Sequence, residues 1–137
     1  MSRSRTDGWT IALALLGASS LVNGVWMLLD PPGWYVNLPA AVPDTGPLNE
    51  HFVRDIGTAF LTLALAFVWA AYAPRWRPPL LAIATFFLVA HAGLHLFDTA
   101  RGFLDAHHWL LDFPGVYLPA LLLPPLAWRV LREASPA

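Results

Sequence analysis

PLLAIATFFLVAHAGLHLF, residues 79–97, is the stretch that decides the fold. It is almost entirely apolar, and it contains no Asp, Glu, Lys or Arg. A helix needs about 20 predominantly apolar residues to cross a hydrocarbon layer that is roughly 30 Å thick. This segment is therefore predicted to be a membrane-spanning helix.

Three further apolar segments accompany it, and the predicted spans are residues 9–29, 52–73, 79–97 and 115–131. The first three match the length that a span requires. The last is shorter and contains Pro124 and Pro125, but packed neighbouring helices can satisfy the carbonyls that proline frees. We therefore predict an all-α fold, in which residues 1–137 form one transmembrane domain, an antiparallel four-helix bundle.

The composition agrees with a multi-pass membrane protein in contact with the lipid bilayer. Hydrophobic residues make up 57% of the chain and charged residues only 12%, whereas soluble domains carry about 25% charged residues. The formal net charge is -1 without a basic block, which argues against a nucleic-acid partner. Because the chain has no cysteine, His, Asp and Glu are the strong metal ligands that remain.

Arginines mark one side of the predicted spans. Basic residues favour the cytoplasmic side of a membrane protein, so both termini and the turn near residue 76 are predicted to be cytoplasmic. The loops 30–51 and 98–114 then face outward and hold most of the acidic residues. The arginines that set this orientation are Arg3, Arg5, Arg75, Arg77, Arg129 and Arg132.

Polar residues gather in the outward half of the spans. His91 lies about 18 Å along its helix from the start of the segment, and His95 and Asp98 follow on the same helix face. His51 and Asp55 are also four residues apart and share a face at the outward end of the preceding span. Ionisable groups within a membrane face the bundle interior and mark function by default.

The spacing of His91 and His95 lets two imidazoles meet one metal ion. The sequence therefore predicts an outward-facing site for a divalent transition metal, Zn, Fe, Mn or Cu. The predicted ligands are His51, Asp55, His91, His95 and Asp98. The residues predicted to bind a further ligand beside them are Asn23, Glu50, Arg54 and Tyr117.

Three alternatives stay open. A b-type haem needs one histidine from each of two facing helices, for which His51 with His91 or His95 would serve. A metal-free site could bind a quinone or another apolar small molecule, with Arg54 holding its oxygen. The network could also be structural in a non-enzymatic membrane subunit, since polar links between membrane helices contribute about 1 kcal/mol each. Whether the protein is a metal-dependent oxidoreductase is left open.

Several polar residues outside the spans are interpreted without a role in the site. His107 and His108 are interpreted as solvated interface residues of the outer loop, with the alternative that one of them caps the site from above. Asp112 is interpreted as a helix-end or solvent residue. Residues 34–52 form a long connection rich in Pro and Gly, which we expect to fold over the site as a lid.

DTGPLNEHFVRDIGTAFL, residues 44–61, together with HAGLHLFD at 91–98 and FPGVYLPALLL at 113–123, resembles the DoxX-like small four-helix bacterial membrane proteins. The specific part of this resemblance is RDIG, residues 54–57. It implies an antiparallel four-helix bundle in the bacterial cytoplasmic (inner) membrane. Because named members of the group are similar to membrane subunits of quinone-linked oxidoreductases, it also implies a redox or quinone association and a partner membrane subunit. It implies no particular catalytic residue.

Overall fold

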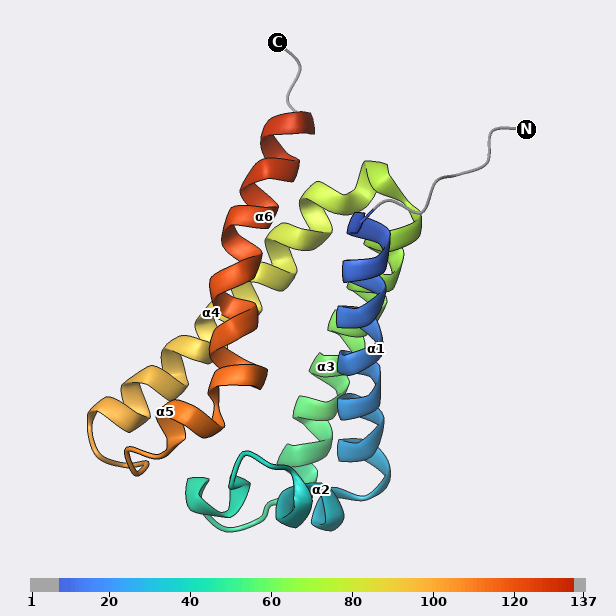
Figure 1. Ribbon diagram of the computed structural model, residues 1–137. Coiled ribbons are helices and arrows are strands. Elements are labelled where there is room, and N and C mark those ends of the chain that lie inside the picture. The colour runs from blue at the N-terminus through green and yellow to red at the C-terminus, as the bar shows by residue number, and fades with distance from the viewer. Residues whose placement is uncertain (1–7, 135–137) are drawn as a thin grey trace.

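The computed structural model describes residues 8–134, which are mostly helical and contain no strand. The predicted all-α class is thereby confirmed. The long helices of the described residues are α1 (Gly8–Leu29), α3 (Glu50–Tyr72), α4 (Arg77–Ala100) and α6 (Leu118–Ala134). They alternate in direction along the chain (Figure 1).

Shorter elements fill the connections between the long helices. Their bounds are α2 (Pro31–Asn37), the 3₁₀ turns η1 (Val42–Thr45) and η2 (Pro74–Trp76), α5 (His108–Leu111) and the π-helical turn η3 (Phe113–Tyr117). We call the end of the molecule at η2 the turn end, and the opposite end, with residues 30–49 and 101–117, the loop end (Figure 1).

Local sequence signals explain where the helices next to the loop end begin and stop. Asn49 caps α3, because its side-chain oxygen accepts a hydrogen bond from the Phe52 amide at 3.1 Å. After α4, Gly102 adopts a φ of 74° and its amide donates to the Thr99 carbonyl at 3.1 Å. This left-handed conformation favours glycine, which explains why α4 stops just before Gly102.

Three helical segments are long and apolar enough to cross a membrane: α1, α3 and residues 74–100, which include α4. With 17 residues, α6 is shorter and is not among them. Large apolar side chains project outward from the long helices, among them Leu15, Leu65 and Phe86, which are 67%, 64% and 77% exposed. These surfaces are compatible with contact to lipid.

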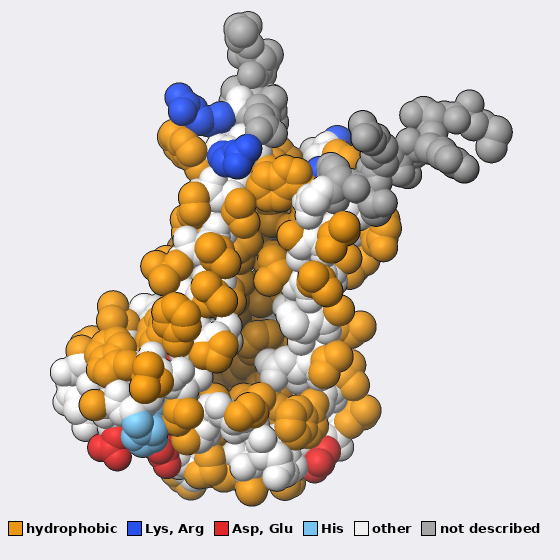
Figure 2. Space-filling model, in the orientation of Figure 1, with side chains coloured by type: hydrophobic (Ala, Val, Ile, Leu, Met, Phe, Trp, Pro, Cys, Tyr) orange, Lys and Arg blue, Asp and Glu red, His pale blue; other side chains and the backbone are white. Residues whose placement is uncertain are grey.

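The four long helices share a core at the turn end. We call α1 with α3 pair one, and α4 with α6 pair two. The two pairs contact each other mainly through α3 and α4. Toward the loop end the pairs diverge (Figure 1), and Figure 2 shows a hollow with hydrophobic side chains between them. The core is formed by Leu13, Leu63, Phe67, Ala70, Ala71, Leu81, Ala84, Leu88, Leu123, Ala127 and Val130.

The helices of pair one approach each other closely where two glycines meet. A Cβ atom added to Gly24 would lie 2.8 Å from the Gly57 carbonyl oxygen, and one added to Gly57 would lie 3.0 Å from Met27 Cβ. Small residues at such crossings let membrane helices pack backbone against backbone.

Gly24→Val is therefore expected to destabilise the protein by about 1–3 kcal/mol, because the larger side chain must push α1 away from α3. Unfolding in detergent mixtures, followed by circular dichroism, measures this loss. Gly93→Val is the matched control, since a Cβ at Gly93 on α4 meets nothing within 4 Å. Equal stability of the two variants would contradict the proposed close packing.

Candidate metal centre

Charge is distributed unevenly along the molecule. On the face shown in Figure 2, arginine side chains lie at the turn end, and acidic and histidine side chains lie at the loop end. The loop end is also where residues 30–49 approach the connection between α4 and α6, so polar groups distant in sequence can meet there.

Asp44 is the acidic residue that the first connection supplies. It lies in η1, and its amide donates to the carbonyl of Ala41, which has a φ of 46°. The Tyr35 hydroxyl donates to the Gly46 carbonyl at 2.8 Å and holds this turn against α2. The Asp44 side chain is thereby directed from the α1–α3 connection toward α5.

His107 and His108 meet Asp44 from the other connection. The Asp44 Oδ2 atom lies 3.3 Å from His107 Nε2 and 3.3 Å from His108 Nε2. The two imidazole rings are 4.8 Å apart. Each residue offers one ligand atom, and these three atoms all lie within 4.8 Å of one another, so the group could hold a metal ion.

The distances within this group fit a shared ion well. An N–H···O hydrogen bond is commonly 2.7–3.2 Å long, and both contacts of Asp44 Oδ2 are longer, at 3.3 Å. A tetrahedral ion with bonds of about 2.0–2.1 Å separates its ligand atoms by about 3.3 Å. The spacing of the carboxylate oxygen from each imidazole nitrogen therefore suits a shared ion, and the two nitrogens lie within 4.8 Å of each other.

Exposure decreases steeply across the group. The side chains of Asp44 and His107 are 45% and 49% exposed, whereas that of His108 is 1% exposed. The group therefore has an open side, through which an ion and a water molecule can reach it, and a buried side that fixes one imidazole in place.

Asp112 lies on the buried side of His108. Its Oδ2 atom is 3.5 Å from His108 Nδ1 and 2.8 Å from His95 Nδ1. The longer contact is an ion-pair distance and leaves His108 Nδ1 without a hydrogen bond among the described residues. A carboxylate beside the outer nitrogen of a metal-bound imidazole orients the ring and favours the tautomer that leaves Nε2 free for the metal.

His95 continues the polar group into α4. Its ring lies 4.7 Å from that of His91, as their spacing of four residues on a helix requires. The His91 ring is stacked on Phe87 at 6.0 Å and meets Phe60 edge-on at 6.3 Å. His91 is therefore surrounded by aromatic rings from α3 and α4 within the apolar part of the protein.

The other predicted ligands from α3 lie on the surface. His51 Nε2 is 3.4 Å from Asp55 Oδ2, with side chains 89% and 61% exposed. Arg54 pairs with Glu50 at 3.0 Å, and its Nε also donates to the Leu28 carbonyl. These are pairs between neighbouring turns of one helix.

The remaining predicted residues also have partners near the loop end. These contacts are Asp98 with Arg101 at 2.8 Å, Asn23 Oδ1 with Trp34 Nε1 at 2.9 Å, and Tyr117 stacked on Trp109 at 6.0 Å. Among the residues that the structure describes, the five predicted metal ligands do not come together as one group of ligand atoms. Their roles as metal ligands stay predictions. The group of Asp44, His107 and His108 is the candidate metal centre of the described residues.

The interpretation of His108 as a solvated residue was wrong, because His108 is 1% exposed. Asp112 is also buried, at 2% exposed, but its interpretation as a helix-end residue is confirmed, since it follows α5 and precedes η3. The signal for the contact between His108 and Asp112 is present in the sequence as a spacing of four residues. No comparable signal relates Asp44 to His108, because 64 residues separate them.

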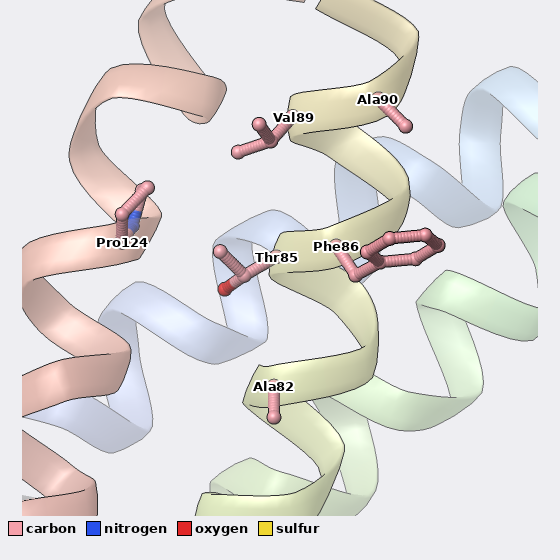
Figure 3. A pocket seen from close by; sticks show the side chains of 6 residues that line it. All are labelled: Ala82, Thr85, Phe86, Val89, Ala90 and Pro124. Atoms are coloured by element: carbon pink, nitrogen blue, oxygen red, sulfur yellow. The ribbon is translucent and has the colours of Figure 1, made fainter.

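An apolar groove between α4 and α6 lies apart from these polar groups (Figure 3). Thr85 and Val89 of α4 point toward Pro124 of α6, while Phe86 points away from it. The lining contains no ionisable side chain, so it offers no acid, base or metal ligand. Its residues are Ala82, Thr85, Phe86, Val89, Ala90 and Pro124.

Neither a protein-family model, nor a curated protein, nor a solved structure matches this chain. The resemblance to the DoxX-like proteins therefore stays a prediction. The geometry of the His/Asp group is the basis on which a function can be argued.

Proposed function

We propose that this membrane protein binds one divalent transition metal ion through Asp44, His107 and His108. The observation that carries the proposal is the position of one carboxylate oxygen, 3.3 Å from each of two imidazole nitrogens. Imidazole and carboxylate ligands suit Zn, Fe, Mn and Cu. Asp112 places a buried negative charge 3.5 Å from the outer nitrogen of His108.

The site would face the outside of a bacterial cytoplasmic membrane. On the face shown in Figure 2, arginine side chains lie at the turn end, and positive residues favour the cytoplasmic side. Arg54 and Arg101 lie near the loop end, and each is paired with an acidic residue. With the turn end in the cytoplasm, the half-exposed side chains of Asp44 and His107 open toward the external water. The protein would then take its metal ion from that side.

Three protein ligands leave a tetrahedral ion with one position for water or substrate, which is the arrangement of catalytic zinc sites. Zinc at this site would acidify a bound water molecule. Iron or copper at the same ligands would permit oxidoreductase chemistry, and the resemblance to the DoxX-like proteins favours that alternative. Metal analysis of the protein purified from its membrane distinguishes the two.

Asp44→Asn is expected to weaken metal binding by at least about 100-fold, because even residues that only support ligands contribute 10–100-fold to affinity. The measurement is equilibrium binding of Zn²⁺ or Co²⁺ to the detergent-solubilised protein after treatment with a chelator. Co²⁺ also reports tetrahedral geometry through its visible absorbance.

Asp55→Asn is the matched control, since Asp55 is also an exposed carboxylate 3.4 Å from a histidine. It should bind metal as the unchanged protein does. The proposal fails if the unchanged protein binds no stoichiometric metal, or if Asp44→Asn and Asp55→Asn bind it equally. A metal lost only on His91→Ala would place the site in the spans instead.

A further inference from the structure

We propose that the metal ion joins helix pair one to helix pair two at the loop end and thereby controls the width of the hollow between them. This inference rests on the proposed function, because it takes the metal site at Asp44, His107 and His108 as its starting point. It adds a conformational consequence to binding.

The shared apolar core joins the two pairs at the turn end. The shared core contains residues of all four long helices, such as Leu13, Phe67, Leu81 and Ala127, and each belongs to the half of its helix nearest the turn end. A buried apolar core holds packed helices together. From there the pairs diverge toward the loop end (Figure 1).

At the loop end the link between the pairs is polar. Asp44 belongs to the connection within pair one, and His107 and His108 belong to the connection within pair two. Among the ion pairs and side-chain hydrogen bonds described for the loop end, the contacts of Asp44 are those that cross from one pair to the other. The proposed ligands therefore come from both sides of the hollow.

Without a metal ion this link is weak. Asp44 and His107 are half exposed, and exposed ion pairs are screened by water and salt. An ion bound to all three side chains would replace these long contacts with short coordinate bonds. Metal binding therefore favours the arrangement with the pairs together, and metal removal releases them to move about the core.

A measurement of distances between spin labels tests this inference. The chain has no cysteine, so labels attach only where cysteines are introduced. Leu29→Cys on pair one and Leu110→Cys on pair two are suitable because these side chains are 79% and 80% exposed at the loop end. Tyr72→Cys with Trp128→Cys, 74% and 61% exposed, provides a reference pair at the turn end.

With metal bound, the distance between labels at positions 29 and 110 is expected to be short and narrowly distributed. A chelator should make the distribution longer and broader, and Asp44→Asn should show this broad distribution with or without added metal. The distance between positions 72 and 128 should not change. Metal binding is measured on the same doubly labelled samples.

The outcomes separate the two proposals. If metal binds stoichiometrically but the distribution between positions 29 and 110 is the same after chelation, the joining of the pairs is refuted and the metal site stands. If the distance at the turn end changes equally, the inference is also refuted, because the pairs do not move about the core. If no metal binds, both proposals are refuted.

Discussion

His108→Ala is expected to abolish stoichiometric metal binding, with an affinity loss of at least about 1000-fold, or about 4 kcal/mol. The variant removes a ligand that is 1% exposed and lies between Asp44 on one side and Asp112 on the other. A buried position admits no replacement ligand from solvent. The two remaining ligands are both half exposed.

Metal content per protein molecule, measured after dialysis against Zn²⁺, checks this expectation. His51→Ala is the matched control, because His51 is 89% exposed and, among residues 8–134, is paired with Asp55 on its own helix. That variant should keep the metal content of the unchanged protein. Circular dichroism and gel filtration establish that each variant is folded in detergent.

His108→Gln serves as a second variant if the alanine variant does not fold, because glutamine keeps a polar side chain of similar size. A folded variant at position 108 that binds metal with undiminished affinity would contradict the proposed site. If His51→Ala loses its metal and both variants at position 108 keep it, the result would support the metal site predicted in the spans.

The spans themselves could be predicted because apolar length alone decides whether a helix can cross a membrane. The helix end at Gly102 could also be predicted, because few other residues adopt a φ of 74° without strain. The divergence of the two pairs could not be predicted. It depends on which apolar side chains interlock, and an almost uniformly apolar sequence does not specify that.

The position of His51 shows where helical periodicity was insufficient. His51 and Asp55 share a face of α3, but the buried face at that end contains Val53 and Gly57. These lie two positions further along, which is about 200° around a helix with 3.6 residues per turn. Because Gly57 packs against α1, the pair of His51 and Asp55 is turned to the surface.

The site in the loops was harder to predict than the spans. The direction of Asp44 depends on the left-handed backbone at Ala41 and on the hydrogen bond from Tyr35 to Gly46. Neither feature has a residue pattern that fixes it in advance. The contact between His108 and Asp112 did have one, but four-residue spacing is common by chance and gains meaning only with burial.

Arg77→Met is expected to lower the free energy of unfolding by roughly 3 kcal/mol, because a buried carbonyl that loses its donor costs about 1–3 kcal/mol. The Ala70 carbonyl loses the donor that Arg77 supplies, whereas the Ala71 carbonyl keeps a hydrogen bond from Thr10 at 3.3 Å. Arg77 is 8% exposed. Its Nε donates to the Ala70 carbonyl at 2.9 Å, and its Nη2 donates to the Ala71 carbonyl and to Thr10 Oγ1, both at 3.2 Å. The last carbonyls of a helix have no partner within it.

Arg77 is the first residue of α4, and its guanidinium donates to the last carbonyls of α3. It also donates to Thr10 of α1, so three of the long helices meet at one guanidinium. Methionine keeps an unbranched apolar stem of similar length, so the variant removes the donors with little change in packing. Unfolding by denaturing detergent, followed by circular dichroism, measures the loss. Metal affinity should stay unchanged in the folded variant, because the metal site lies at the opposite end.

Arg75→Met is the matched control for this prediction. Arg75 is exposed, and its guanidinium lies 5.9 Å from the Trp76 ring. Surface substitutions of this kind change stability by about 0.5 kcal/mol or less. If Arg75→Met and Arg77→Met destabilise the protein equally, the carbonyl contacts of Arg77 do not hold the turn end together. If only Arg77→Met lowers the free energy of unfolding, the result supports the view that the contacts at the turn end hold the two helix pairs together.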